Sequence, residues 1–264
     1  MKLRDWDQLP QDMQNDAVRV YYDILQSKRR YLVIKRLFDV AASASLLVLL
    51  SPLFAVTAIA IRIESPGPFM YRQTRKTAYE QDFRIHKFRS MYIGSDRGRL
   101  LTMKNDSRVT RVGAFIRKYK IDELGQLIDV LRGDMTFVGV RPQVQKYVNH
   151  YTDEMKATFL LPAGITSLAS IYYRNENDLL LGHKDPEKLY LTEILPDKMN
   201  YNLLGIRKLG LGYELKIFLM TILTVFGKDY KPAKQLYTTA FMPEEPEEEQ
   251  SSEQVKEPAE VTNG

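Results

Sequence analysis

The longest apolar stretch of the chain runs from Val40 to Ile61, and its 22 residues include no charge. A helix of this length could cross a bilayer, and an uncharged run this long is rarely the core of a globular domain. Ser51-Pro52 lies at its middle, where proline interrupts the helical hydrogen-bond ladder and bends the axis. The pattern therefore predicts a membrane-associated helix that breaks at Ser51 and Pro52.

Basic residues flank this stretch on both sides, with Lys28, Arg29, Arg30, Lys35 and Arg36 before it and Arg62, Arg72, Arg75 and Lys76 after it. Positively charged flanks tend to remain in the cytoplasm. A helix that enters the bilayer, bends and returns satisfies this tendency at both ends, whereas a straight span satisfies it at one. We therefore expect a re-entrant membrane helix over residues 35–62 rather than a span.

The remaining pattern divides the chain into three further parts. Residues 1–34 are polar, with apolar and aromatic positions at Val18, Tyr21, Tyr22 and Leu25, and they predict an N-terminal amphipathic extension. Residues 63–228 read as the catalytic domain, in which Ile217–Phe226 forms either an interfacial amphipathic helix or a helix packed on the membrane hairpin. Residues 229–264 are expected to form an acidic disordered tail.

Charge is distributed unevenly between these parts. The chain carries a formal charge of +5, while the segment 243–264 holds eight Glu and one Lys, a net of −7, so residues 1–242 carry +12. A basic body favours an anionic partner such as nucleic acid, phospholipid headgroups or a phosphorylated substrate. The absence of cysteine excludes a thiol nucleophile and a cysteine-ligated zinc site, and the three scattered histidines argue against a histidine-built metal site.

The best candidate for chemistry is a helical pattern over residues 121–131. An apolar stripe is expected on one face, formed by Leu124, Leu127, Ile128 and Leu131. Three polar residues are expected to project from the opposite face, namely Asp122, Gln126 and Asp129. The adjacent carboxylates of Asp122 and Glu123 lie at the helix start, where free backbone N–H groups can bind phosphate.

Cations surround this carboxylate pair in the sequence, including Lys87, Arg89, Arg117 and Arg141. Arginine forks grip phosphate oxygens in a bidentate manner, while a carboxylate attacks phosphorus or holds a metal ion. Acidic residues in a first helical turn are also common capping residues, but this many cations around them favour a pyrophosphate substrate.

In these residues and in the motifs around them, the chain resembles the monotopic phosphoglycosyl transferases, also called bacterial sugar transferases. The resemblance covers about residues 35–225 and follows the family's order of motifs, which here read Lys-Arg-Leu-Phe-Asp-Val (35–40), Glu-Ser-Pro-Gly-Pro-Phe-Met-Tyr-Arg-Gln (64–73), Lys-Phe-Arg-Ser-Met (87–91), Asn-Asp-Ser-Arg-Val-Thr-Arg-Val-Gly (105–113), Asp-Glu-Leu-Gly-Gln-Leu (122–127), Gly-Asp-Met-Thr-Phe-Val-Gly-Val-Arg-Pro (133–142) and Pro-Ala-Gly-Ile-Thr (162–166).

The resemblance implies a fold and a location. The fold is an α-rich α+β monotopic membrane protein, with a re-entrant membrane helix broken by proline and a small catalytic domain that faces the cytoplasm and carries surface amphipathic helices. The expected location is the bacterial cytoplasmic (inner) membrane, in contact with membrane lipids. A homodimer through exposed membrane-proximal surface is compatible with this arrangement.

The resemblance also implies a reaction. The enzyme would transfer a phosphosugar from a UDP-sugar to undecaprenyl phosphate and release UMP, as the first membrane step of polysaccharide or glycoconjugate synthesis. Asp122 matches the nucleophile, which would form a covalent aspartyl phosphosugar, and Glu123 matches its catalytic partner. Mg²⁺ would be held at these two carboxylates. Phosphate or substrate binding would fall to Lys87, Arg89, Arg117, Gln126 and Arg141.

The chain departs from the family pattern at three places. Gly125 replaces a customary proline, Val140 replaces the proline before Arg141-Pro142, and Ser-Leu-Ala-Ser (167–170) stands where a Gly and a Trp-Gln pair are common. Because the two carboxylates and the arginines are intact, these departures bear on sugar specificity more than on reaction class.

Three alternatives remain open at the level of sequence. A non-catalytic membrane scaffold could keep the same fold, although such a protein has no need of both carboxylates. A nucleic-acid-binding protein is disfavoured by the proline-broken apolar segment and by the lack of an aromatic-interleaved basic motif, so no nucleic-acid partner is expected. A glycosyltransferase that acts on a sugar hydroxyl would release UDP instead of UMP.

Overall fold

The protein is helix-rich with two small sheets, in agreement with the predicted α-rich α+β class. The computed structural model describes residues 1–95, 106–180 and 183–230, so the predicted acidic tail lies outside the described residues from residue 231 onward. The helices are α1 (Asp16–Ser27), α2 (Arg29–Leu49), α3 (Ser51–Glu64), α4 (Arg111–Lys118), α5 (Gln126–Arg132), α6 (Gln145–Val148), α7 (Leu168–Tyr172), α8 (Glu176–Leu180), α9 (Pro186–Leu189), α10 (Leu195–Arg207) and α11 (Leu211–Val225). Short 3₁₀ segments are η1 (Trp6–Gln8), η2 (Gln11–Met13), η3 (Ala78–Glu80), η4 (Ile121–Gly125) and η5 (Met155–Leu160), and η6 (Tyr190–Ile194) is a π-helical segment.

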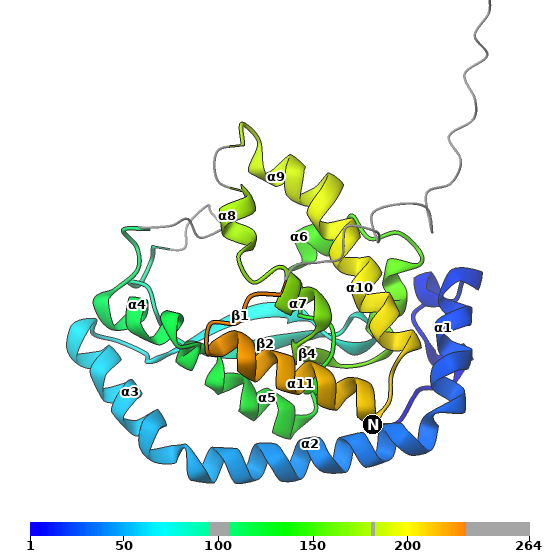
Figure 1. The fold of residues 1–264 in the computed structure, drawn as a ribbon, viewed down its shortest axis with the longest axis horizontal. Coiled ribbons are helices and arrows are strands. Elements are labelled where there is room, and N and C mark those ends of the chain that lie inside the picture. The colour runs from blue at the N-terminus through cyan, green and yellow to red at the C-terminus, as the bar shows by residue number, and fades with distance from the viewer. Residues whose placement is uncertain (96–105, 181–182, 231–264) are drawn as a thin grey trace, which may run out of the picture. The chain divides into compact units, whose positions relative to one another are not determined.

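The strands form two separate pairs at the centre of the described fold (Figure 1). Strands β1 (Met70–Lys76) and β2 (Asp82–Phe88) are antiparallel, with Tyr71 opposite Lys87 and Arg75 opposite Phe83. Strands β3 (Met135–Val138) and β4 (Ala163–Thr166) are parallel. The apolar residues of β2, β3, β4, α5 and α11 form one buried cluster, which places the carboxyl end of β2 close to the residues that flank α5.

The long apolar stretch bends where the sequence predicts. Among the described residues no single helix is both long and apolar enough to span a membrane. The helices α2 and α3 together reach that length and composition, but the helix axis bends by 61° between them. Pro52 has no N–H to donate to the carbonyl of Val48, and the hydroxyl of Ser51 donates to that carbonyl at 2.8 Å instead. The Ser-Pro pair thus makes the break and also satisfies the carbonyl that the break exposes.

Polar side chains attach the first half of α2 to the body of the fold. Lys35 Nζ lies 2.8 Å from Glu214 Oε1 of α11, and Asp39 accepts a hydrogen bond of 2.7 Å from the hydroxyl of Thr136 in β3. Arg36 donates to two carbonyls at the end of α5, where the helix dipole favours a cation. These contacts make α2 part of the same packed structure as the strands and α5.

The N-terminal segment 1–34 contains the predicted amphipathic helix, which is α1. Its predicted apolar positions are all buried, namely Val18, Tyr21, Tyr22 and Leu25. They belong to the same hydrophobic cluster as residues of α10 and η5. The segment therefore packs onto the domain that follows α3, although α2 and α3 separate the two in sequence.

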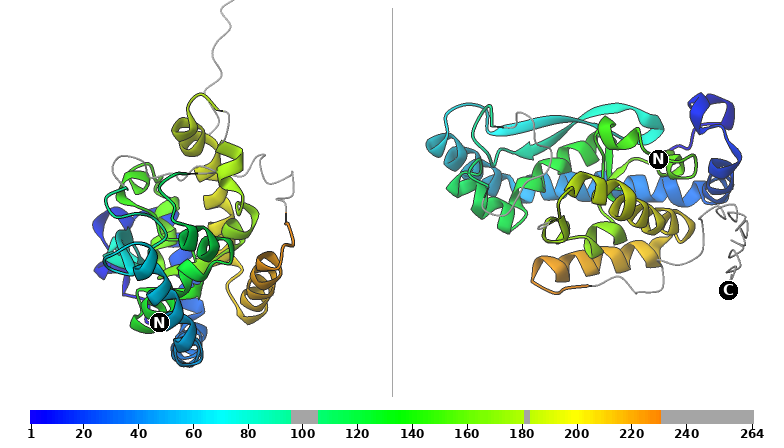
Figure 2. Two further views of the ribbon diagram at one scale, coloured as in Figure 1. Left: turned by 90° about the vertical axis from the view of Figure 1, so that its left-hand side faces the viewer. Right: turned by 90° about the horizontal axis from the view of Figure 1, so that it is seen from above.

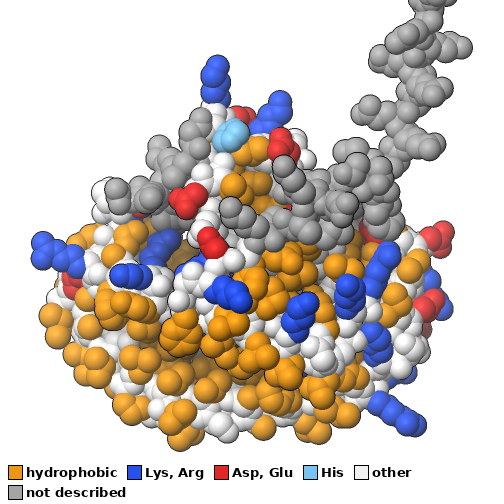
Figure 3. Space-filling model, viewed as in Figure 1, with side chains coloured by type: hydrophobic (Ala, Val, Ile, Leu, Met, Phe, Trp, Pro, Cys, Tyr) orange, Lys and Arg blue, Asp and Glu red, His pale blue; other side chains and the backbone are white. Residues whose placement is uncertain are grey.

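One side of the described fold is covered with exposed apolar side chains (Figure 3). Figures 1 and 2 show α2 and α11 extending in the same general direction along this side. The helix α11 buries Ile217 and Met220 against the strands and leaves most of its other apolar residues exposed. The exposed apolar residues of α2 and α3 include Val33, Ile34, Leu37, Phe38, Val48, Leu49, Val56, Ile59 and Ile63. Those of α11 and the residue after it include Leu211, Leu215, Leu219, Leu223 and Phe226. So large a patch marks an interaction surface.

Candidate active site

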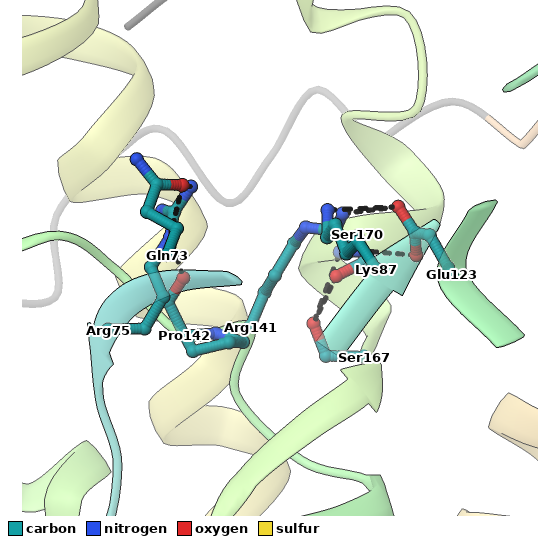
Figure 4. Close-up of polar contacts among 8 residues, drawn as sticks. All are labelled: Gln73, Arg75, Lys87, Glu123, Arg141, Pro142, Ser167 and Ser170. Carbon is teal, nitrogen blue, oxygen red and sulfur yellow. Dashed lines mark hydrogen bonds and ion pairs between the residues drawn. The ribbon is translucent and has the colours of Figure 1, made fainter. Parts of the chain in front are cut away.

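Three charged side chains from separate elements meet beside the strands and form what we call the 87–123–141 cluster: Lys87 of β2, Glu123 of η4 and Arg141, which follows β3 (Figure 4). Arg141 binds Glu123 as a fork, with Nη2 at 2.5 Å from Oε1 and Nη1 at 3.2 Å from Oε2. Lys87 Nζ lies 3.7 Å from the same Oε1. Residues more than fifty positions apart in sequence are thus gathered around one carboxylate.

A close backbone approach sets this arrangement. The segment η4 packs on β2, and a Cβ placed on Gly125 would lie 2.8 Å from the carbonyl oxygen of His86. A contact that short requires the backbone to move. Glycine at position 125 therefore allows Asp122 and Glu123 to lie directly against the strand that carries Lys87.

Glu123 is held in its ionised form. Burial alone would raise the pKa of its carboxyl, but the guanidinium of Arg141 and the ammonium of Lys87 outweigh burial and hold the pKa well below its usual range. The same pairing raises the pKa of Arg141. Glu123 is therefore a fixed anion that orients two cations, and it is poorly placed to act as a nucleophile.

Asp122 is in a different state, although it is the next residue. Its Oδ1 is buried and has no hydrogen-bond partner among the described residues. Burial and the neighbouring charge of Glu123 raise the pKa of Asp122, while Lys87, Lys120 and Arg117 oppose the shift. A carboxylate oxygen without hydrogen bonds, next to cations that can hold phosphate oxygens, has the properties of a nucleophile for phosphorus.

Lys87 is also perturbed. Burial lowers the pKa of its ammonium to about 8, with the negative charge of Glu123 opposing this effect and the positive charge of Arg141 adding to it. The Lys87 ammonium is therefore charged at neutral pH but gives up its proton more readily than an exposed lysine.

The other predicted binding residues lie in different settings. Arg117, in the last turn of α4, lies close enough for its charge to act on Asp122. Arg89 donates to the carbonyls of Ser65 and Pro66 and thereby holds the turn between α3 and β1, so a phosphate role for Arg89 would require these bonds to open. Gln126 is only 1% exposed.

The prediction that Asp122, Gln126 and Asp129 project from one exposed polar face of residues 121–131 is wrong. Gln126 and Asp129 are buried, whereas Leu131 of the expected apolar stripe is 37% exposed. The first turn, η4, is a 3₁₀ helix with three residues per turn, which shifts the phase of the α-helix that follows. In addition, α5 is packed by α2 on one side and by β2 and β3 on others. Asp129 binds His86.

Two side chains of β1 extend this site and were not among the binding residues predicted from sequence. Arg75 was assigned there only to the basic flank of the membrane helix. In the structure its guanidinium bonds to the side chain of Gln73 and to the carbonyl of Pro142, the residue after Arg141 (Figure 4). The spacing of Gln73 and Arg75, two apart on a strand, places both on one face, but only the pairing of β1 with β2 shows which face.

The two adjacent carboxylates can be tested as ligands for the Mg²⁺ that the family resemblance implies. No group of three or more His, Cys, Asp or Glu able to hold a metal is present in the described part of the chain. Mg²⁺ at phosphoryl-transfer sites needs only one or two carboxylates, because substrate phosphates and water complete its shell. The unpartnered Oδ1 of Asp122 fits this requirement, whereas Glu123 would have to share its oxygens with Arg141.

The chain is similar to known proteins over most of its described length. Residues 30–228 match the family described as bacterial sugar transferase. The chain is 37% identical over 199 residues to a UDP-glucose:undecaprenyl-phosphate glucose-1-phosphate transferase of Caulobacter vibrioides, covering 74% of this chain and 70% of that protein.

Two further relatives are similar over a smaller share of their length. A UDP-N-acetylgalactosamine-undecaprenyl-phosphate N-acetylgalactosaminephosphotransferase of Aeromonas hydrophila is 45% identical over 126 residues, 47% of this chain and 30% of that protein. A UDP-glucose:undecaprenyl-phosphate glucose-1-phosphate transferase of Klebsiella pneumoniae is 34% identical over 200 residues, 74% of this chain and 40% of that protein. This chain thus spans less than half of these two relatives.

Proposed function

Because the chain belongs to the bacterial sugar transferase family, we propose that it transfers a sugar 1-phosphate from a UDP-sugar to undecaprenyl phosphate and releases UMP. The relatives are named as transferases that use UDP-glucose or UDP-N-acetylgalactosamine, and these names support the reaction class. The single observation that carries the proposal is the contrast between Asp122, with a buried unpartnered oxygen, and Glu123, which is clamped by Arg141.

The proposed chemistry has two displacements. A carboxylate oxygen of Asp122 attacks the β-phosphorus of the UDP-sugar, the bond from that phosphorus to the bridging oxygen breaks, and UMP leaves with the bridging oxygen. A phosphate oxygen of the lipid then attacks the same phosphorus and breaks its bond to Asp122, which regenerates the carboxylate. Two steps at one nucleophile replace a single displacement between two repelling phosphates.

The surrounding residues hold charge during both steps. Lys87 and Arg141 neutralise the phosphate oxygens, and Glu123 keeps both cations in place. Mg²⁺ at Asp122, with Glu123 as a shared ligand, would add further neutralisation of the pyrophosphate when bound. Arg117 adds a positive charge on the side of Asp122.

A membrane location is part of the proposal because one substrate is soluble and the other is a lipid. The bent pair of α2 and α3 and the exposed apolar face of α2, α3 and α11 support a re-entrant insertion into the cytoplasmic membrane. The 87–123–141 cluster would then lie on the cytoplasmic side, where UDP-sugars are available.

The test is nucleotide release by the full-length chain in detergent, with Mg²⁺, undecaprenyl phosphate and either UDP-glucose or UDP-N-acetylgalactosamine. We expect UMP release that requires the lipid for sustained turnover and is lost in Asp122→Asn. Release of UDP would indicate a glycosyltransferase acting on a hydroxyl, and no release with a wider panel of UDP-sugars would favour the non-catalytic scaffold.

A further inference from the structure

Arg75 is a partly buried cation whose charge no carboxylate balances. Its guanidinium donates only to neutral acceptors: Nε and Nη2 to Gln73 Oε1 at 3.1 and 2.7 Å, and Nη1 to the carbonyl of Pro142 at 3.4 Å. Among the described residues no Asp or Glu lies within ion-pairing distance of Arg75. An arginine guanidinium carries more N–H donors than these three bonds use, so donors remain for a ligand.

A second guanidinium lies beside it. Figure 4 shows Arg141 between Arg75 and the carboxylate of Glu123. The fork of Arg141 is taken up by Glu123, so the positive charge of Arg75 remains uncompensated. Burial and the positive charge of Arg141 together lower the pKa of Arg75 to about 10. Both effects are costs to the fold that a bound anion would offset.

The position of Arg75 is fixed by its strand. Gln73, two residues earlier on the same face of β1, holds the guanidinium through two of its nitrogens. Because residues paired across an antiparallel ladder share a face, Lys87, opposite Tyr71, lies on this face as well. The cations of Lys87, Arg141 and Arg75 thus lie close enough for their charges to act on one another.

From these contacts we propose that Arg75, oriented by Gln73, forms a second phosphate-binding subsite beside the 87–123–141 cluster. The inference rests on the proposed function and names a residue for a phosphate other than the one that reacts. A fixed guanidinium fork suits a phosphate group. That phosphate has two possible sources, the one retained by the leaving UMP or the one of the lipid acceptor.

The test compares Arg75→Gln with Arg72→Gln in the full-length chain. Arg72 lies on the same strand three residues away, so its side chain lies on the other face, where it binds the carbonyl of Arg84. UMP release is measured without lipid, where only the first displacement occurs, and at steady state with varied undecaprenyl phosphate. Arg75→Lys, which keeps the charge and loses the fork, is the second variant.

If the subsite takes the nucleotide phosphate, Arg75→Gln raises the KM for the UDP-sugar and the inhibition constant of UMP about 10- to 100-fold, as expected for a charge-assisted hydrogen bond. If it takes the lipid phosphate, the single-turnover release of UMP is unchanged and the KM for undecaprenyl phosphate rises by that factor. In both cases Arg75→Lys falls between wild type and Arg75→Gln.

The inference is overturned if Arg75→Gln, or Arg75→Lys should the first variant not fold, shows the same constants as Arg72→Gln. That result leaves the proposed function untouched as long as the wild-type chain releases UMP. A wild-type chain that releases no UMP would instead remove the proposed function itself, so the two failures are distinguishable.

Discussion

Asp129 of α5 and His86 of β2 are joined by two contacts inside the protein. Asp129 Oδ2 accepts a hydrogen bond of 2.8 Å from the backbone N–H of His86, and Oδ1 lies 2.5 Å from Nδ1 of the His86 ring. His86 precedes Lys87, and Asp129 lies one helix after Glu123. The pair therefore connects the strand that carries Lys87 to the helix that follows the two carboxylates.

Replacement of Asp129 by Ala is expected to lower the free energy of unfolding by about 2–4 kcal/mol, because it leaves the buried backbone N–H and the ring Nδ1 of His86 without a partner. Asp129→Asn keeps an acceptor for the backbone N–H and is expected to lose less. Denaturant titration in detergent measures both. A loss below about 1 kcal/mol in Asp129→Ala would mean that the connection contributes little to stability.

The second prediction concerns the close packing of Gly125 against β2. A Cβ at this position would lie 2.8 Å from the carbonyl oxygen of His86, so Gly125→Ala should push η4 away from β2 and lower kcat by about tenfold or more, with a loss of stability of about 1–3 kcal/mol. Gly125→Pro should be as harmful, even though proline is customary at this position in the family.

The control for Gly125 is Gly212→Ala, because nothing lies within 4 Å of a Cβ at position 212. We expect wild-type kcat and equal or higher stability for that variant. Wild-type kinetics in Gly125→Ala would show that the carboxylates do not need this close approach.

The activity should depend on the charge of Lys87. Burial lowers the pKa of its ammonium to about 8; Glu123 and Asp122 oppose this shift, and Arg141 and Arg75 favour it. The ammonium is charged below this pKa and neutral above it, so kcat/KM, which reports the free enzyme, should fall above about pH 8. In Lys87→Arg the side chain stays charged, and this alkaline decline should move to higher pH. Identical profiles would exclude Lys87 as the titrating group.

The proposed re-entrant insertion predicts that both ends of the bent helix pair lie on the same side of the membrane. Arg30 and Arg62 are exposed, and the chain has no cysteine, so single cysteines at these positions can be labelled selectively. In intact cells, a membrane-impermeant thiol reagent should reach neither position. In Pro52→Ala, where the helical ladder can continue, we expect one of the two to become accessible. Labelling of either position in the unmodified background would indicate a span.

The bend and the carboxylate pair could be predicted from sequence because each depends on neighbouring residues. Pro52 lacks its N–H wherever the chain folds, and Asp122 and Glu123 are adjacent by covalent structure. The stripe of α1 was also predictable, because Val18, Tyr21, Tyr22 and Leu25 repeat at helical spacing and all are buried. Local chemistry and periodicity are sufficient for features of this kind.

Other features depend on contacts that sequence spacing does not reveal. The proposed role of Arg75 follows from the pairing of β1 with β2 and from its proximity to Pro142, 67 residues away. Burial of Gln126 and Asp129 follows from the 3₁₀ turn before α5 and from packing on several sides of a short helix. A uniform helical periodicity could represent neither effect.

The most direct test of the account is to look for the covalent bond at Asp122. The full-length chain is incubated with Mg²⁺ and its UDP-sugar in the absence of lipid, and then examined by intact mass and peptide mapping. We predict a burst of UMP of at most one equivalent and a mass increase of one sugar phosphate on Asp122, which disappears when undecaprenyl phosphate is added and is absent in Asp122→Asn. An adduct on another residue, or turnover in the presence of lipid with no adduct and no burst in its absence, would contradict the role assigned to Asp122.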